Sequence, residues 1–336
     1  MITASFSQDS IKRLEPYLEI EHHDWLKKGR PFKQAELKEL ARDKEIIVVE
    51  TCEIQKEVID AAPELKIVAC CRGLKGDDST IDVEACNQKN IPIIYAPGRN
   101  LNAVAEHTLL LVLAVMRKVK PATRWLYENR WQQWLDFYTT FRTSEIMGKT
   151  VGLVGFGDIG RRVAQLFLAF GASVLASDPY VADDIFEEYG VTKVDLETLL
   201  KNADIVSLHV NVSKETIGLI DAEKISLMKP TSFLVNTARA VVVEHDALYN
   251  ALKEGRIAGA ALDVFYQEPT GPEKEPLLTL DNVFATPHLG GTTNEVIDNH
   301  SKMVENDIIR LLSGEKPVYL LNPEVLPNFR EKLQKG

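Results

Sequence analysis

One glycine-rich segment, VGLVGFGDIGRR, constrains the fold of this 336-residue chain more than any other part of the sequence. It places three glycines in a G-x-G-x-x-G spacing: Gly155, Gly157 and Gly160. An apolar run at 151–154 precedes them and predicts a strand, and the residues that follow predict a helix. The spacing in this context predicts the first strand–turn–helix unit of a Rossmann-type parallel sheet.

The same segment predicts a bound dinucleotide. The free N–H groups and the dipole at the start of the helix attract a pyrophosphate, and Gly157 lets the backbone approach it closely. A second predicted strand at 173–177 ends at Asp178, where a carboxylate would bind the ribose hydroxyls. Because a carboxylate there repels the 2′-phosphate of NADP, and no arginine follows it closely, we expect the cofactor to be NAD.

Apolar runs separated by helical or polar stretches continue through the chain and favour parallel sheets. The later series predicts six strands: 151–154, 173–177, 204–208, 233–236, 259–264 and 283–286. The earlier series predicts three: 46–49, 65–69 and 91–94. Helices are expected at 101–118, with a break marked by Pro121, and at 293–313.

These elements predict an α/β protein with two doubly wound parallel-sheet domains and a cleft between them. The Rossmann domain is expected at 102–293. The other domain, flavodoxin-like and substrate-binding, is expected to be discontinuous and to comprise 1–101 and 294–336.

Composition limits the partners of the chain. The net charge of −10 argues against nucleic acid, because phosphate binding needs a basic face. The longest apolar run, at 109–116, is too short to cross a membrane, and the start of the chain lacks the pattern of a signal peptide, so we expect a cytoplasmic protein. The cysteines lack C-x-x-C spacing and predict reduced thiols rather than a metal site: Cys52, Cys70, Cys71 and Cys86.

Three polar side chains follow predicted strands of the later series. Arg239 stands in NTAR, Glu268 in DVFYQEP and His288 in TPHLGG. Doubly wound sheets bind their ligands at the carboxyl ends of strands. A hydride arriving at a carbonyl carbon leaves charge on the oxygen, so a proton or hydrogen-bond donor must lie there. A histidine beside a carboxylate is suited to supply that proton.

The segments GKTVGLVGFGDIGRRVA, FLVNTARAVVVEHDAL, AGAALDVFYQEP and TPHLGG together resemble the D-isomer-specific 2-hydroxyacid dehydrogenase family, which includes phosphoglycerate dehydrogenase, over about residues 46–315. The resemblance implies that Arg239 binds the substrate carboxylate and polarises its carbonyl. It implies that Glu268 orients His288, which acts as an acid in reduction and as a base in oxidation. It also implies these further cofactor contacts: Asp158, Ile159, Thr237, Ala238, Asp263, His288 and Gly290.

The resemblance has implications for the earlier domain and for assembly. A loop there, CCRGLKGDDSTID, is expected to hold the substrate, with Arg72, Lys75 and Gly76 as candidates. The segment PGRNLNAVAEHT is similar to the start of the family's dimer-forming helix, which implies a homodimer. The aromatic stretch at 125–141 is compatible with a subunit-contact arm, an active-site flap or packing under a loop.

Three functions remain open from the sequence. The first is NAD-dependent interconversion of a small anionic 2-hydroxy acid and its 2-oxo acid. The second is phosphite oxidation, since the LKG segment with Lys75, together with Trp134 and Tyr138, resembles the phosphite dehydrogenase branch of the family. The third is an NAD(H)-sensing binding protein of the corepressor kind, which would bind the cofactor without turnover.

Overall fold

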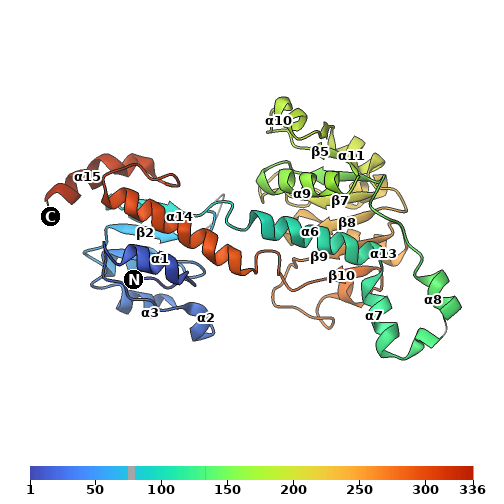
Figure 1. Cartoon of the computed structure of the whole chain (residues 1–336), viewed down its shortest axis with the longest axis horizontal. Helices are drawn as coiled ribbons and strands as arrows, with labels where there is room; N and C mark the ends of the chain where they lie inside the picture. Colours follow the sequence, from blue (N-terminus) through green and yellow to red (C-terminus); the bar gives the residue numbers. More distant parts are fainter. Residues whose placement is uncertain (75–79, 133, 336) are drawn as a thin grey trace. The chain divides into compact units, whose positions relative to one another are not determined.

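The computed structural model describes residues 1–74, 80–132 and 134–335 (Figure 1). The chain divides into two compact units. Unit 1 comprises Met1–Asn100 and Thr293–Gly336, and unit 2 comprises Leu101–Thr292. These boundaries lie one residue from the expected ones. Each unit has its own parallel sheet, so the predicted α/β class is confirmed.

Unit 2 contains a seven-stranded sheet in the order β10-β9-β8-β7-β4-β5-β6, and neighbouring strands in it are all parallel. Its strands are β4 (Thr150–Val154), β5 (Ser173–Ser177), β6 (Thr192–Lys193), β7 (Ile205–Leu208), β8 (Phe233–Asn236), β9 (Gly259–Leu262) and β10 (Val283–Ala285). The sequence did not predict β6, because this edge strand has two exposed residues and no apolar signal. The predicted 259–264 strand is shorter and ends at Leu262.

Helices cover both faces of this sheet. One core contains residues of α6 (Leu101–Met116), α9 (Asp158–Ala169) and α10 (Asp183–Glu188). The other contains residues of α11 (Leu196–Asn202), α12 (Ala222–Leu227) and α13 (His245–Lys253). Neighbouring strand residues point to opposite cores, as Ile205 and Val206 of β7 do. Burial on both faces explains why these strands read as continuous apolar runs.

Unit 1 contains three parallel strands in the order β1-β2-β3: β1 (Ile46–Val49), β2 (Ile67–Cys70) and β3 (Ile93–Tyr95). Single bridges extend both edges, with Ile2 beside Val48 and Leu320 beside Ile94. Helices α1 (Gln8–Leu14) and α14 (Asn294–Leu312) pack on one face. Helices α3 (Gln34–Leu40), α4 (Lys56–Ala61) and α5 (Val83–Gln88) pack on the other. The remaining helices of this unit are α2 (Trp25–Lys28), η4 (Pro323–Val325) and α15 (Leu326–Lys335).

The predicted break at Pro121 is wrong. Helix α6 ends at Met116, and Lys118 adopts a left-handed conformation with φ 52° before α7 (Val119–Tyr127) begins. Pro121 lies in the first turn of α7. A proline is tolerated there because the first N–H groups of a helix have no partner within it.

The aromatic stretch continues from α7 through η1 (Arg130–Gln132) to α8 (Trp134–Thr140). Part of it packs on itself: Trp125 contacts the edge of Phe141 and lies under the Arg130 guanidinium. Tyr127, Trp131 and several neighbours are exposed instead. The side chain of Trp134 lies outside the described residues.

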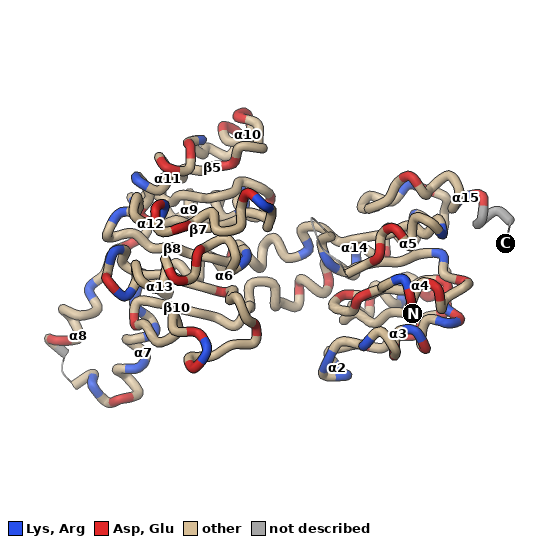
Figure 2. Tube along the Cα trace, turned by 180° about the vertical axis from the view of Figure 1, so that it is seen from behind, with Lys and Arg blue, Asp and Glu red and all other residues tan. Residues whose placement is uncertain are grey.

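Acidic and basic residues are interspersed over most helices of both units (Figure 2).

The four cysteines all lie in the described part of the chain, are buried and form no disulfide. Burial raises the pKa of the Cys86 thiol to about 12. No helix among the described residues has the length and apolar character needed to span a membrane.

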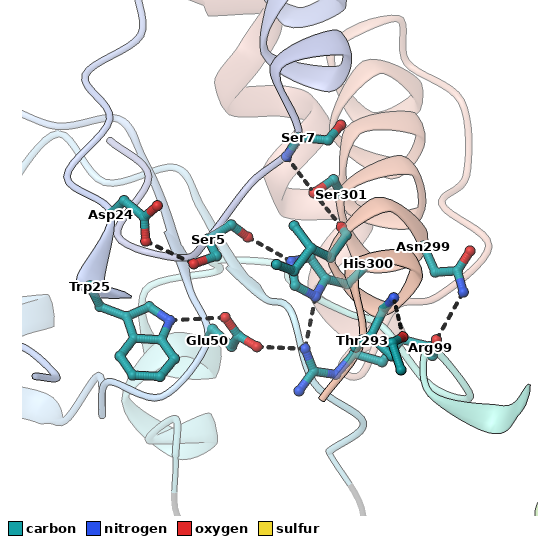
Figure 3. A network of polar contacts seen from close by, with 12 residues as sticks. Ser5, Ser7, Asp24, Trp25, Glu50, Arg99, Thr293, Asn299, His300 and Ser301 are labelled. Carbon is teal, nitrogen blue, oxygen red and sulfur yellow. Dashed lines mark hydrogen bonds and ion pairs between the residues drawn. The ribbon is translucent and has the colours of Figure 1, made fainter. Parts of the chain in front are cut away.

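A buried polar network occupies the carboxyl edge of the unit 1 sheet (Figure 3). Glu50 follows β1 and accepts hydrogen bonds from Trp25 Nε1 (3.0 Å) and Arg99 Nη1 (2.6 Å). Arg99 Nη1 also lies 2.8 Å from His300 Nδ1, and His300 Nε2 lies 2.7 Å from the Ser5 carbonyl. His300 is therefore the neutral tautomer that carries its proton on Nε2, and burial lowers its pKa.

We predict that Arg99→Met destabilises the protein by about 3 kcal/mol at neutral pH, because it leaves the buried Glu50 carboxylate without its cation. Burial raises the pKa of Glu50, but the hydrogen bonds from Trp25 and Arg99 outweigh burial and hold it below its usual value. The stabilisation is therefore present at neutral pH and is lost as the pH falls through that lowered pKa. Urea unfolding measured against pH tests this.

The matched control is Arg42→Met, which removes an exposed pair with Glu39 and should cost less than about 1 kcal/mol. A double variant that replaces both Arg99 and Glu50 with Met should be more stable than Arg99→Met alone. Equal unfolding free energies for Arg99→Met and Arg42→Met would contradict the buried ion pair.

Candidate functional site

The candidate site lies at the carboxyl ends of three neighbouring strands of unit 2. In the sheet, Asn236 of β8 pairs with Leu262 of β9, and Leu262 pairs with Ala285 of β10. The strands are parallel, so the residues that follow them leave the sheet at the same edge. Arg239, Glu268 and His288 stand on those three connections.

Two of the three predicted side chains contact each other. His288 Nδ1 lies 2.6 Å from Glu268 Oε2, and Glu268 Oε1 accepts a hydrogen bond from the Phe265 backbone N–H (2.8 Å). A carboxylate accepts and does not donate, so the proton of this bond is on Nδ1. Nε2 of His288 is therefore the nitrogen left for a substrate, and the side chain is 48% exposed.

Arg239 does not touch that pair in the described structure. Its side chain is exposed, and Nη1 donates to the adjacent Ala238 carbonyl (2.7 Å). The buried Asn236 shapes the turn before it, accepting from Ala238 N–H and donating to the Arg239 carbonyl. The backbone of Arg239 is thus held by Asn236, and its guanidinium has no carboxylate partner in the part of the chain that the structure describes. Arg239 is therefore able to bind an external anion.

Asp263 organises the loop that carries His288. Its carboxylate is 2% exposed and accepts from Thr286 Oγ1 (2.6 Å) and from the Leu289 and Gly290 N–H groups (2.8 Å each). Burial raises the pKa of Asp263, but the hydrogen bonds from its neighbours outweigh burial and hold it below its usual value. A carboxylate with both oxygens occupied by the protein positions this loop. The cofactor contact that the resemblance implies for Asp263 stays a prediction.

His107 completes this arrangement and was not foreseen. Its Nε2 lies 2.9 Å from Thr286 Oγ1 and 3.2 Å from Asp263 Oδ1. It stands in α6, within the AEHT of the segment that the sequence links only to dimer formation, and it does not follow a predicted strand. His288 itself has φ 54°, a left-handed conformation that costs a non-glycine residue about 1 kcal/mol or more and is maintained by such surroundings.

The glycine loop lies where the order of strands reverses, between β4 and β7. Gly155 has φ 94°, and a side chain there would lie 2.6 Å from the His209 carbonyl oxygen. A side chain on Gly160 would collide with the Gly155 carbonyl. These contacts confirm that two of the glycines permit close backbone packing at the first turn of α9.

Gly157 differs from the other two glycines, because among the described residues no atom beyond its two chain neighbours lies within 4 Å of where its Cβ would be. It precedes α9, whose first N–H groups have no partner within the helix. Asp158 is exposed and bonds to Arg161, and Ile159 packs on the core under the loop. Open space beside free N–H groups fits a dinucleotide pyrophosphate held by Gly157 and the start of α9.

Asp178 follows β5 at the same edge. Its Oδ2 accepts from the Phe156 N–H in the glycine loop (2.8 Å), and Oδ1 accepts from the Tyr180 N–H (2.9 Å). The carboxylate is thereby fixed beside the loop, which fits a group that binds ribose hydroxyls.

His209 follows β7 next to the loop, and burial lowers its pKa to about 3, so it is neutral. The sequence could have marked His209 as a candidate site residue, because it directly follows the predicted strand 204–208.

The other predicted residues fall in different places. Thr237 Oγ1 lies 3.0 Å from Thr108 Oγ1, and the Ala238 N–H bonds to Asn236. Arg72 follows β2 in unit 1 and is half-buried, and its carbonyl accepts from the Ala96 N–H. Lys75 and Gly76 lie outside the described residues. No cluster of side chains able to hold a metal ion occurs in the described ranges.

Comparison with known proteins identifies the family of the chain. Residues 109–290 match the family model for the NAD-binding domain of D-isomer specific 2-hydroxyacid dehydrogenases. A putative 2-hydroxyacid dehydrogenase of Bacillus subtilis, YoaD, is 38% identical over 94% of this chain and 91% of its own length. A glyoxylate reductase of Thermofilum pendens is 39% identical over 91% of this chain and 88% of its own length.

A solved structure supports the same assignment. The D-lactate dehydrogenase of Aquifex aeolicus, complexed with NAD and lactic acid, is 28% identical and superposes with a TM-score of 0.73, over 94% of this chain and 96% of that one. The α/β fold with two parallel sheets agrees with these relatives. The chain therefore belongs to the D-isomer-specific 2-hydroxyacid dehydrogenase family and is an NAD-dependent oxidoreductase.

Proposed function

We propose that the chain interconverts a small D-2-hydroxy acid and its 2-oxo acid, with Arg239, Glu268 and His288 as the residues that act on the substrate. The observation that carries this proposal is the 2.6 Å hydrogen bond between His288 Nδ1 and Glu268 at the carboxyl edge of the unit 2 sheet. It fixes the imidazole with Nε2 outward, as a proton donor or acceptor requires.

NAD(H), when bound, supplies or accepts the hydride. In reduction, His288 Nε2 gives a proton to the oxygen that gains charge, and in oxidation it takes the hydroxyl proton. Glu268 stabilises the imidazolium that forms in oxidation. Arg239 binds the substrate carboxylate and draws electron density from the neighbouring carbonyl. Thr237, Ala238 and Gly290 are proposed as cofactor contacts on the same connections.

The substrate class is tested by mixing the protein with NADH and 2-oxo acids, or with NAD and D-2-hydroxy acids, and following NADH absorbance. Glyoxylate is the first compound to use, because the Thermofilum pendens relative is named as its reductase. Phosphite with NAD belongs in the same panel, since Lys75 lies outside the described residues. Binding of NADH without turnover of any acid would favour the sensing function instead.

Assembly and location stay predictions. The exposed side chains of the aromatic stretch, among them Tyr127 (82%) and Trp131 (61%), support a role in contact with a second copy, as the predicted homodimer requires. The cytoplasm remains the expected compartment.

We predict that His288→Ala lowers kcat by about 100-fold or more, because it removes the proton donor and acceptor. The dissociation constant of NADH, measured by fluorescence titration, should change little. His23→Ala is the control, because it changes a partly exposed histidine of unit 1 and should leave kcat unchanged. His245→Ala is not a suitable control, because His245 lies near the loop of Glu268. Equal kcat values for His288→Ala and the wild type would exclude the acid–base role.

We predict that Asp263→Asn lowers kcat about tenfold or more. An amide nitrogen in place of either oxygen would face N–H donors, which disrupts the loop that carries His288. If Asp263 acts mainly by positioning, the loss in kcat will exceed the loss in NADH affinity. A large rise in the NADH dissociation constant with kcat preserved would show instead that it acts as a cofactor contact.

We predict that Asp178→Ala relaxes the preference for NAD over NADP, because it removes the negative charge that repels a 2′-phosphate. The measurement is the ratio of kcat/KM with the two cofactors at low ionic strength, where the repulsion is least screened. The ratio should fall mainly through improved use of NADP. An unchanged ratio would remove Asp178 from cofactor selection.

A further inference from the structure

The connection that carries Glu268 is tied to the segment that follows Arg239. The connection runs from Asp263, after β9, to Glu275, before η3 (Pro276–Thr279). Tyr266, two residues before Glu268, donates its hydroxyl hydrogen bond to the Val243 carbonyl (2.7 Å). Its ring meets the His245 ring edge-on, at 5.9 Å and 90°. The far end of the connection is attached to the same segment by a hydrogen bond of 2.9 Å between Glu275 Oε1 and His245 Nε2.

The partner segment begins at Arg239. Arg239 precedes the short helix η2 (Ala240–Val242), and Val243 and His245 follow that helix directly. The contacts of Tyr266 and Glu275 therefore join the two stretches of chain that carry Glu268 and Arg239. These two side chains are themselves not in contact, so their relative position depends on what joins the stretches.

His245 is surrounded so that its charged form is favoured. Nε2 faces Glu275 Oε1, and Nδ1 lies 3.0 Å from Asp246 Oδ1. Only an imidazolium can donate to both carboxylates at once. Burial lowers the pKa of His245, but the hydrogen bonds to Asp246 and Glu275 outweigh burial and raise it above its usual value. Glu244 and Tyr266 are the other titratable groups close by.

Glu275 needs this cation. Its side chain is 7% exposed, and Oε1 also accepts from the Leu277 N–H (3.1 Å) at the start of η3. A carboxylate buried to this extent is unstable without a paired positive charge. A cavity of about 20 Å³ lies beside the pair, lined by residues of both stretches, including Ala240, Tyr266 and Leu277.

We propose that His245 and Glu275 are positioning residues of the catalytic site: their ion pair, with the Tyr266 ring edge-on to it, holds the Glu268 connection against the segment of Arg239. The inference rests on the proposed roles of Glu268 and Arg239. Since the pair needs the imidazolium, it is intact at neutral and lower pH and is lost as the pH rises through the raised pKa of His245. Turnover then declines on the alkaline side without loss of cofactor binding.

The test compares Glu275→Gln, His245→Gln and a double variant that exchanges the two residues, His245→Glu with Glu275→His. Each single variant should lower kcat about tenfold, with a smaller change in KM, because displaced catalytic groups slow the reaction more than they weaken binding. In Glu275→Gln the alkaline decline of kcat should begin at lower pH, because His245 loses one of its two carboxylates. The exchanged variant restores an ion pair and should recover much of kcat.

Asp246→Asn is the matched control. Asp246 contacts the same ring but is 90% exposed, so its loss should change kcat much less than the loss of Glu275. Unfolding temperature and NADH affinity are measured for every variant, and His245→Gln serves if Glu275→Gln does not fold.

The outcomes separate this inference from the proposed function. If the wild type turns over no acid, the proposed function fails. If the wild type is active and His288→Ala is not, yet the single variants keep wild-type kcat and the same pH profile, the positioning role is overturned. It is also overturned if kcat falls only in proportion to folded protein and the exchanged variant recovers nothing.

Discussion

A single buried carboxylate holds the reactive loop of unit 2 in place. Asp263 leaves β9 at the sheet edge and binds two backbone N–H groups and one hydroxyl of the loop that follows β10. The left-handed backbone of His288 persists because this loop is fixed on both sides of it. The 2.6 Å contact with Glu268 then depends on two connections from neighbouring strands, each anchored separately. The parallel strands end side by side, and the buried hydrogen bonds then fix the positions of the loops that follow them.

Much of this could be predicted from the sequence, because the signals were local. The glycine spacing required specific backbone geometry, which Gly155 and Gly160 show. Strands buried on both faces gave clear apolar runs, whereas the exposed edge strand β6 gave none. His107 and the hydrogen bonds of Asp263 could not be predicted, because α6 and the loop after β10 meet the end of β9 only in the folded protein. Pro121 misled because proline fits a first helical turn as well as a break.

The two sheets use their carboxyl edges in different ways. In unit 1, Glu50, Arg99 and His300 bind one another and are largely buried, so their charges and hydrogen-bonding groups are committed inside the protein. In unit 2, His288 and Glu268 form a pair but remain 48% and 35% exposed. A buried, mutually satisfied set stabilises a fold, whereas a partly exposed pair with one nitrogen outward retains the capacity to exchange a proton.

The proposed binding of an anionic substrate has to occur on a chain of net charge −10. Arg99 is matched by Glu50, so it adds no net positive charge at its sheet edge. Among the arginines that the structure describes on the strand-end connections considered above, Arg72 and Arg239 are in no ion pair. An uncompensated guanidinium on a rigid turn gives a strong and directional contact for a carboxylate even when the whole protein is acidic. Because Arg99 is committed to the fold, Arg239 is the better placed of these two residues for the proposed binding of an acid substrate. The buried Asn236 fixes the turn that carries Arg239.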